Sequence, residues 1–321
     1  MDFGRIDPEL LDGLKRLQAA MPLGHNLADD LAGTRQAAAS RNAILKEGFT
    51  LPEDVTLEVI SFTGSQGHSV ELRSMRPKQP TSPTLPLVYW MHGGGYILGS
   101  ADQDDPLMAK FAHELGCIAV SVDYRLAPET PYPGPLNDAY EGLCHLVENA
   151  ETYPIDTDRM VIGGASAGAG LAAGLALRVR DEAAFGLAGQ VLLYPMIDDT
   201  NVAAPSDTLE NTAVWSREAN LYGWTSYLGT APGGPDIAEY AAPARATDLS
   251  GLPPTYLPVG ALDLFLDEDM DYAQRLLKAG NACELHIFPG AVHGFNGFMP
   301  MARISQICNQ EIMAFVAKAI S

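Results

Sequence analysis

The feature that most constrains this chain is a regular alternation of short apolar runs with helical patterns. Eight runs have the length and composition of strands, at 55–62, 69–75, 85–91, 117–122, 159–163, 189–194, 255–260 and 283–288. Helical patterns follow at 104–115, 135–149, 166–180, 267–279 and 301–319. Because strands that alternate with helices form a mostly parallel sheet with both faces covered, we predict an α/β fold with eight strands. The short connection 63–68 predicts an antiparallel hairpin at the sheet edge.

Two stretches, 1–48 and 199–246, lack strand patterns. The first predicts two amphipathic helices. In the second, Trp215, Tyr222, Trp224 and Tyr227 recur at helical spacing. Two interpretations remain open together: these aromatic residues form a small helical unit with its own packing, or they line a binding pocket.

The chain has 321 residues, of which 47% are hydrophobic, enough to bury one large core. Its formal net charge of −20 would repel a phosphate backbone or an anionic membrane, so nucleic acid is not expected as a partner. This acidity mainly favours solubility, and salt adaptation is the alternative. The four cysteines lie far apart without a C-x-x-C pair, so we expect no metal site.

The amino-terminal segment is an acidic amphipathic pattern, whereas a secretion signal has a basic segment followed by an apolar one. No run of about 18 uncharged apolar residues occurs, so we expect no stable membrane insertion. These two observations predict a cytoplasmic protein.

A candidate nucleophile lies in a G-x-S-x-G motif, Gly164 to Gly168, with Ser166 at its centre. The motif directly follows a predicted strand and precedes an apolar helix. Small residues on both sides let the strand turn sharply and expose the serine hydroxyl at the helix N-terminus, where backbone amides favour developing negative charge.

Three consecutive glycines, at 93–95, follow another strand and His92. A loop without side chains lets two backbone amides approach a substrate, and the Ala167 amide can supply a third, which together form an oxyanion hole. The alternative is a tight turn or a phosphate cradle, but no Lys-Ser/Thr follows to make a nucleotide-binding loop.

The serine needs a base, and among seven histidines only His293 lies in a loop after the last predicted strand. The order serine, acid, histidine places the acid between Ser166 and His293. Candidates are Asp198, Asp199, Asp263, Asp267, Glu268 and Asp269. We favour Asp263 because it directly follows a strand, whereas Asp267 and the residues after it begin a helix. These residues predict acyl transfer to water without a cofactor or metal.

With these motifs, the chain resembles the bacterial hormone-sensitive-lipase-like esterases over about residues 50–320. The segments 123–129, 263–268 and 293–295 add to the likeness. The resemblance implies a triad of Ser166, Asp263 and His293, oxyanion amides from Gly94, Gly95 and Ala167, and a carboxylate partner for Arg125. It also implies an α/β-hydrolase domain, 49–198 and 247–321, under a helical cap formed by 1–48 and 199–246. Short- to medium-chain acyl esters as substrates and a homodimer complete the expectation.

The chain departs from the family pattern at Ala165, Ala169 and Leu264, where many members carry an acidic residue, glycine and proline. None of these changes removes a triad atom, although the first puts a carboxylate role beside the nucleophile in doubt. Two other functions fit the sequence less well. A dinucleotide-binding reading of the glycines at 168 and 170 begins too far into the helix, and a ligand receptor on the same fold would not need Ser166 and His293.

Overall fold

The structure, a computed structural model, describes residues 3–20, 27, 29–201 and 214–321. The predicted strand positions are confirmed with shifts of a few residues at their ends. The strands are β1 (Val55–Thr63), β2 (Ser69–Pro77), β3 (Leu85–Met91), β4 (Ile118–Asp123), β5 (Ile155–Ala165), β6 (Gly189–Leu193), β7 (Thr255–Gly260) and β8 (Cys283–Phe288). The largest difference is β5, which begins four residues early because Ile155 pairs with Leu85 of β3.

These strands form one eight-stranded sheet in the order β1-β2-β4-β3-β5-β6-β7-β8. β1 pairs with β2, and β2 with β4, in antiparallel fashion, while the neighbouring pairs from β4 to β8 are parallel. The predicted edge hairpin is therefore present. Since the strands β3 to β8 are parallel, their carboxyl ends meet at one edge of the sheet, where an α/β fold places its site.

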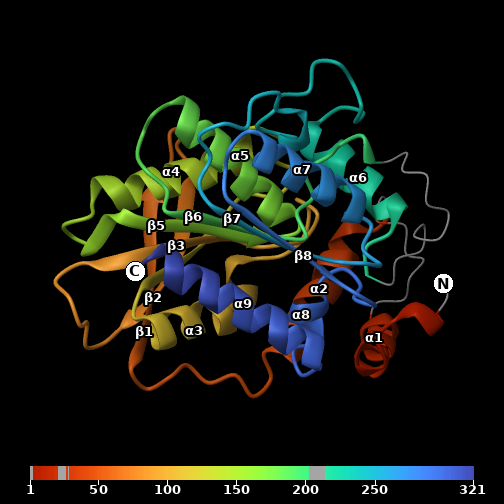
Figure 1. Cartoon of the computed structure of the whole chain (residues 1–321), viewed down its shortest axis with the longest axis horizontal. Helices are drawn as coiled ribbons and strands as arrows, with labels where there is room; N and C mark the ends of the chain where they lie inside the picture. Colours follow the sequence, from red (N-terminus) through yellow and green to blue (C-terminus); the bar gives the residue numbers. More distant parts are fainter. Residues whose placement is uncertain (1–2, 21–26, 28, 202–213) are drawn as a thin grey trace.

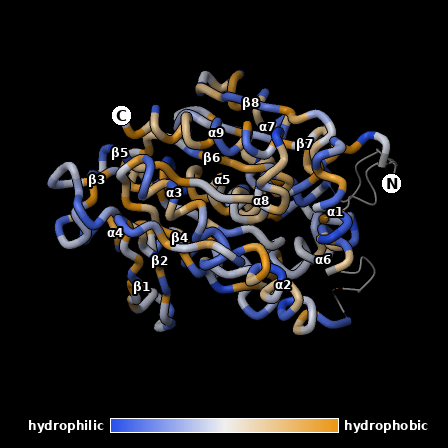
Figure 2. The backbone as a smooth tube through the Cα atoms, turned by 90° about the horizontal axis from the view of Figure 1, so that it is seen from below, coloured by the Kyte–Doolittle hydropathy of each residue, from blue (hydrophilic) through white to orange (hydrophobic). Residues whose placement is uncertain are grey.

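Helices cover both faces of the sheet, as Figure 1 shows. One face carries α3 (Asp105–Leu115) and α9 (Arg303–Ala319), and the other carries α4 (Gly134–Glu148), α5 (Ala167–Asp181) and α7 (Leu266–Lys278). The strand β3 is buried along its whole length, as a parallel strand between two helical layers must be. In Figure 2 the apolar segments accordingly run through the central strands, and hydrophilic ones lie mostly on the outside.

Of the remaining helices, α1 (Pro8–Ala20), α2 (Leu31–Leu45) and α6 (Arg217–Leu228) lie toward one end of the molecule in both views. The short α8 (Phe295–Phe298) was not predicted from the sequence. The fold is that of an α/β hydrolase, and the two helices expected within 1–48 are present. Residues 202–213 of the predicted cap insertion lie outside the described part of the chain.

Aromatic residues of α6 pack on the main domain and do not form an independent core. The Tyr227 ring stacks on that of Tyr96, with ring centroids 4.0 Å apart, and Trp224 lies 5.3 Å from the same ring. The Tyr96 hydroxyl in turn donates to the Met196 carbonyl over 2.7 Å. The second interpretation holds for Trp215, which lines a pocket.

Within the described residues, no helix is long and apolar enough to span a bilayer. The same residues contain no group of three or more His, Cys, Asp or Glu side chains arranged to hold a metal ion. All four cysteines carry free thiols, and those of Cys117 and Cys308 are buried.

Candidate active site

The turn from β5 into α5 presents Ser166 at the carboxyl edge of the sheet. Ser166 has a φ of 57°, a conformation that L residues rarely adopt, and its amide donates to the Leu193 carbonyl over 2.9 Å. The glycines of the motif make this turn sterically feasible. A Cβ on Gly164 would lie 2.4 Å from the Gly168 carbonyl carbon, and a Cβ on Gly168 would lie 2.1 Å from the Met91 carbonyl oxygen.

The glycine loop after β3 lies against this turn. Gly94 has a φ of +135°, and a Cβ there would lie 2.1 Å from the Leu98 carbonyl oxygen. Gly93, Gly94 and Gly95 line the same pocket as Ser166. In the described part of the chain, the amides of Gly94, Gly95 and Ala167 donate to no carbonyl outside regular helix and sheet bonding. These three amides are the candidate donors to an oxyanion next to Ser166.

Hydrogen bonds between two loops bring the acid and the histidine together. After β7, the Ala261 amide donates to the Phe288 carbonyl over 2.9 Å, and the Leu262 amide donates to the Ala291 carbonyl over 3.0 Å. The loops that carry Asp263 and His293 are thereby fastened side by side. A Cβ on Gly260 would lie 2.4 Å from the Ala291 carbonyl oxygen, so only glycine permits this approach.

The three side chains form a continuous hydrogen-bonded chain. His293 Nε2 lies 2.9 Å from Ser166 Oγ, and His293 Nδ1 lies 2.8 Å from Asp263 Oδ2. The other Asp263 oxygen accepts the Phe265 amide over 3.0 Å, which holds the carboxylate in place. All three residues are buried, and Asp263 is fully inaccessible. The rings of Tyr194 and Phe265 meet the imidazole edge to face at 4.9 and 5.1 Å.

The other carboxylates considered as the acid have different partners. Asp198 accepts from the amide and hydroxyl of Thr200, and Asp199 pairs with Arg245. Asp267 is exposed. All of these candidates follow β6 or β7, and the sequence favoured Asp263 among them only by its position directly after a strand.

Two buried carboxyl groups, those of Glu268 and Asp269, lie in the first turn of α7, shortly after Asp263. The Glu268 carboxylate accepts the Ile197 amide over 2.9 Å, and neither oxygen of the fully buried Asp269 has a hydrogen-bond partner. Burial raises the pKa of both carboxyl groups well above their usual range.

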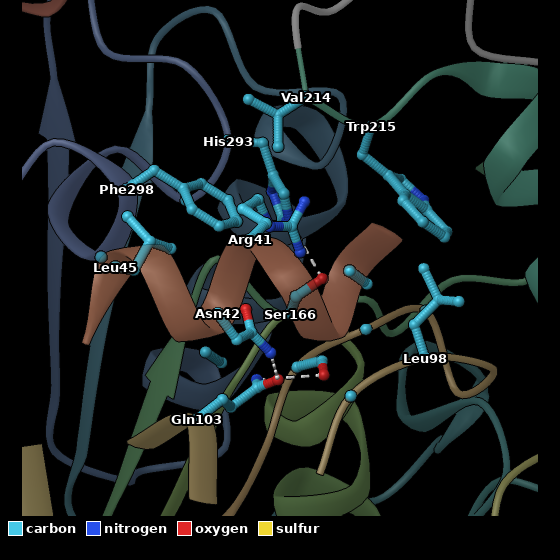
Figure 3. A pocket seen from close by; sticks show the side chains of 18 of the residues that line it. Arg41, Asn42, Leu45, Leu98, Gln103, Ser166, Val214, Trp215, His293 and Phe298 are labelled. Atoms are coloured by element: carbon cyan, nitrogen blue, oxygen red, sulfur yellow. Dashed lines mark hydrogen bonds between the residues drawn. The ribbon is translucent and has the colours of Figure 1, made fainter. Parts of the chain in front are cut away.

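The pocket above Ser166 has a volume of about 170 Å³. Figure 3 shows its wall, in which α2 contributes Arg41, Asn42 and Leu45 opposite the serine and histidine. Trp215 and Phe298 add apolar surface at opposite sides of the pocket in this view. The Arg41 guanidinium lies over the Phe298 ring, 5.0 Å from its centroid, and burial lowers its pKa.

Sequence reasoning missed the polar residues that line this pocket, namely Arg41, Asn42, Gln103 and Asp104. No motif marks them, and Asp104 was assigned only to the start of a helix. Burial and the neighbouring Asp105 raise the pKa of the Asp104 carboxyl to about 8, and one of its oxygens is sealed from solvent with no hydrogen-bond partner.

The expected partner of Arg125 is the buried carboxylate of Asp138, at 2.7 Å between Nη2 and Oδ1. Asp138 also accepts the Arg125 amide over 2.9 Å and lies 2.8 Å from the His68 ring. This cluster fastens the segment after β4, whose Tyr124 hydroxyl donates to the His92 carbonyl over 2.6 Å. The Arg125–Asp138 cluster is therefore linked through Tyr124 to His92, directly before the glycine loop.

Comparison with known proteins places this arrangement in a family. A family model described as "alpha/beta hydrolase fold" matches residues 88–297, which include Ser166, Asp263 and His293. The chain therefore belongs to the α/β-hydrolase fold family, in its hormone-sensitive-lipase-like branch, and by this relationship it is an esterase, a carboxylic ester hydrolase.

Its relatives agree on this class. "Carboxylesterase NlhH" of Mycobacterium tuberculosis is 36% identical over 220 residues, which cover 67% of each chain. "Ethyl acetate hydrolase" of Pseudomonas putida is 30% identical over 300 residues, 90% of this chain and 92% of its own. Among solved structures, "Bacterial Heroin Esterase" matches with a TM-score of 0.93 and 37% identity, and the match covers 100% of both chains.

Proposed function

We propose that this esterase hydrolyses short- to medium-chain acyl esters through an acyl-enzyme on Ser166. The observation that carries the proposal is the unbroken hydrogen-bonded chain from Asp263 through His293 to Ser166 at the floor of a pocket. Nucleophile, base and orienting acid occupy the geometry that this chemistry requires.

The steps follow from these contacts. Ser166 Oγ attacks the ester carbonyl carbon while its proton passes to His293 Nε2, and the carbonyl oxygen becomes an oxyanion. The amides of Gly94, Gly95 and Ala167 stabilise that oxyanion. The tetrahedral intermediate collapses as His293 returns the proton to the departing alkoxide. A water molecule, deprotonated by His293, then attacks the acyl-enzyme, and the acid leaves as Ser166 regains its proton.

Asp263 holds the imidazole with Nδ1 protonated and stabilises the imidazolium formed in each half-reaction. Ser166, His293 and backbone amides supply nucleophile, base and electrophilic donors, so we expect the reaction to need no cofactor or metal.

Pocket size supports the acyl-length part of the proposal. A volume of about 170 Å³ is below the several hundred cubic ångströms of pockets that enclose drug-sized ligands. The apolar side chains of Leu98, Val214, Trp215 and Phe298 favour an alkyl chain. The name of the Pseudomonas putida relative, an ethyl acetate hydrolase, also indicates a short acyl group. We expect kcat/KM for p-nitrophenyl esters to peak at chains of two to six carbons; a peak at ten or more would contradict this proposal.

The cap assignment of 1–48 and 199–246 over a catalytic domain of 49–198 and 247–321 belongs to the same proposal. It is supported by α2 and Trp215, which line the pocket opposite Ser166. A cytoplasmic location and a homodimer remain predictions from the sequence.

The decisive test is covalent labelling. An organophosphate should add its mass to Ser166 alone, and Ser166→Ala should abolish both labelling and turnover. Ser121→Ala is the matched control, because Ser121 is equally buried in β4 and its hydroxyl has no hydrogen-bond partner. The control should retain full activity. Turnover by Ser166→Ala close to the parent rate would end the proposal.

A further inference from the structure

The carbonyl of Gly93 accepts two side-chain hydrogen bonds beside the active site. His92 Nδ1 lies 3.0 Å from this oxygen, and Gln103 Nε2 donates to it over 3.2 Å. A carbonyl oxygen only accepts, so the proton of the buried imidazole is on Nδ1. Burial lowers the pKa of His92, which keeps the ring neutral. The ring is held by stacking on Tyr124, with centroids 4.1 Å apart.

This carbonyl belongs to the same peptide group as the Gly94 amide. Because a peptide is planar and trans, its C=O and N–H point in opposite directions, so donors that hold the oxygen also set the direction of the N–H. Donation to the oxygen further polarises the group and strengthens the N–H as a donor. The two side chains therefore act at the far end of a proposed oxyanion donor.

Gln103 is held by the cap in the orientation that this bond requires. Asn42 on α2 donates through Nδ2 to Gln103 Oε1 over 3.3 Å, which leaves Nε2 for Gly93. Figure 3 shows Asn42 and Gln103 side by side below Ser166. The space is tight: a Cβ on Gly99 would lie 2.5 Å from the Gly93 oxygen and 2.8 Å from Gln103 Oε1.

Both ends of the helix α2 are hydrogen-bonded to the segment that follows the glycine loop and contains Gln103. Near its start, Arg35 donates to the Ile97 carbonyl over 2.8 Å. Just after its end, Lys46 donates to the Asp102 carbonyl over 3.0 Å. Asn42 lies between these anchors, so the seating of α2 determines where the Gln103 amide is held.

We infer that Gln103 is a positioning residue that couples the cap helix α2 to the oxyanion hole, by orienting the Gly93–Gly94 peptide while Asn42 orients Gln103. This inference rests on the proposed role of the Gly94 amide. If Gln103 only supported the fold, its loss would affect folding or substrate affinity. If it orients the Gly94 amide, its loss should instead destabilise the tetrahedral intermediate.

The test replaces Gln103 by methionine, which has similar length and no donor. We expect kcat for p-nitrophenyl acetate to fall by about 10- to 100-fold. This is more than the loss of one ordinary hydrogen bond would cause and less than the loss of a whole oxyanion-hole donor would cause. KM should change by less than about 2-fold, as expected when an interaction acts only in the transition state. The inhibition constant of a trifluoromethyl ketone, which forms a tetrahedral oxyanion on serine, should rise by the same factor as kcat falls.

Two further variants test the coupling. Gln103→Glu keeps the side-chain shape but, assayed at a pH where the carboxyl is ionised, cannot donate. It should therefore give the same loss of kcat with little change in KM, and it replaces the methionine variant if that variant does not fold. Asn42→Ala should lower kcat by about 2- to 13-fold, the worth of one hydrogen bond. Combined with Gln103→Met it should add nothing, because Asn42 acts through Gln103.

The matched control is Gln306→Met. Gln306 on α9 also donates to a backbone carbonyl, that of Met301 over 3.3 Å, but it is exposed and does not line the pocket. Its kinetics should be unchanged. An unchanged kcat in Gln103→Met, a loss confined to KM, or an additive double variant would overturn the inference. If Ser166 is still labelled in those variants, the proposed function survives that failure; if Ser166 is never labelled, the proposed function itself has failed.

Discussion

Replacing Gly168 by alanine tests how closely the nucleophile turn and the glycine loop must approach. The added Cβ would lie 2.1 Å from the Met91 carbonyl oxygen and 2.4 Å from that of His92. Ordinary carbon contacts need about 3.5 Å, so the end of β3 must move by roughly 1 Å or more relative to α5. Overpacking of this kind costs about 1–3 kcal/mol, from which the better helix propensity of alanine subtracts up to about 1 kcal/mol.

Activity should suffer more than stability. The displaced carbonyls lead directly into Gly93 and Gly94, so the proposed oxyanion donors move away from Ser166, and a shift of about 1 Å can cost about 100-fold in rate. The assays are urea unfolding, followed by tryptophan fluorescence, and kcat for p-nitrophenyl acetate. Gly186→Ala is the control, since no heavy atom lies within 4 Å of its added Cβ. It should keep kcat and change stability by less than about 0.5 kcal/mol. A Gly168→Ala variant with parental kcat would refute the reasoning.

Other substitutions test the acid and the pocket. Asp263→Asn should lower kcat by about 10⁴-fold through the wrong imidazole tautomer, while Asp198→Asn, which loses only contacts to Thr200, should stay within about 3-fold; the reverse order would reassign the acid. Asp104 gives a pH prediction. The unfolded chain releases this proton near pH 4 and the folded chain only near pH 8, so the free energy of unfolding should fall as pH rises through that window. Urea titrations at pH 5, 7 and 9 should show that the free energy of unfolding falls less with pH in Asp104→Asn than in the parent protein. The same fall in both proteins would contradict a raised pKa of the Asp104 carboxyl.

The sheet was predictable because parallel strands buried on both faces are almost continuously apolar. The strand β3, for example, is apolar along its whole length and has no exposed residue in the structure. The sharp turn from β5 into α5 at Ser166 was predictable for a different reason, because only small residues fit two positions before and two positions after the serine. In both cases a local steric rule is visible in the sequence itself.

The pocket wall was not predictable in the same way. Arg41 and Asn42 reach it from α2, more than 100 residues from Ser166 in the sequence, and their contacts depend on how that helix packs. Asp263 was distinguishable from Asp198 only by its position after a strand, whereas the structure separates them by the hydrogen bonds between the loops after β7 and β8. Tertiary packing, and not a local pattern, decides such positions.

Backbone strain is concentrated where the chemistry is proposed. Of the four non-glycine residues with positive φ in the described part of the chain, Ser166 and Tyr194 line the pocket, Tyr96 directly follows the glycine loop, and Ala183 follows α5. Such conformations cost about 1–3 kcal/mol each and persist only when the surroundings impose them. Here the Tyr194 amide donates to the Pro258 carbonyl over 2.9 Å, and its hydroxyl donates to Asn296 over 2.9 Å.

The neighbouring strands therefore hold Ser166 and Tyr194 rigidly, and Tyr194 in turn packs on the imidazole. The helix α2 reaches the site through side-chain hydrogen bonds, and the one from Asn42 to Gln103 spans 3.3 Å and is partly exposed. A segment held by few, partly exposed hydrogen bonds unfolds locally at a lower free energy than a buried one. We therefore expect α2 to move first while the serine and histidine stay in place. Hydrogen exchange should accordingly be faster in the amides of α2 than in those of β5 and α5, and equal protection would mean that cap and catalytic edge open as one unit.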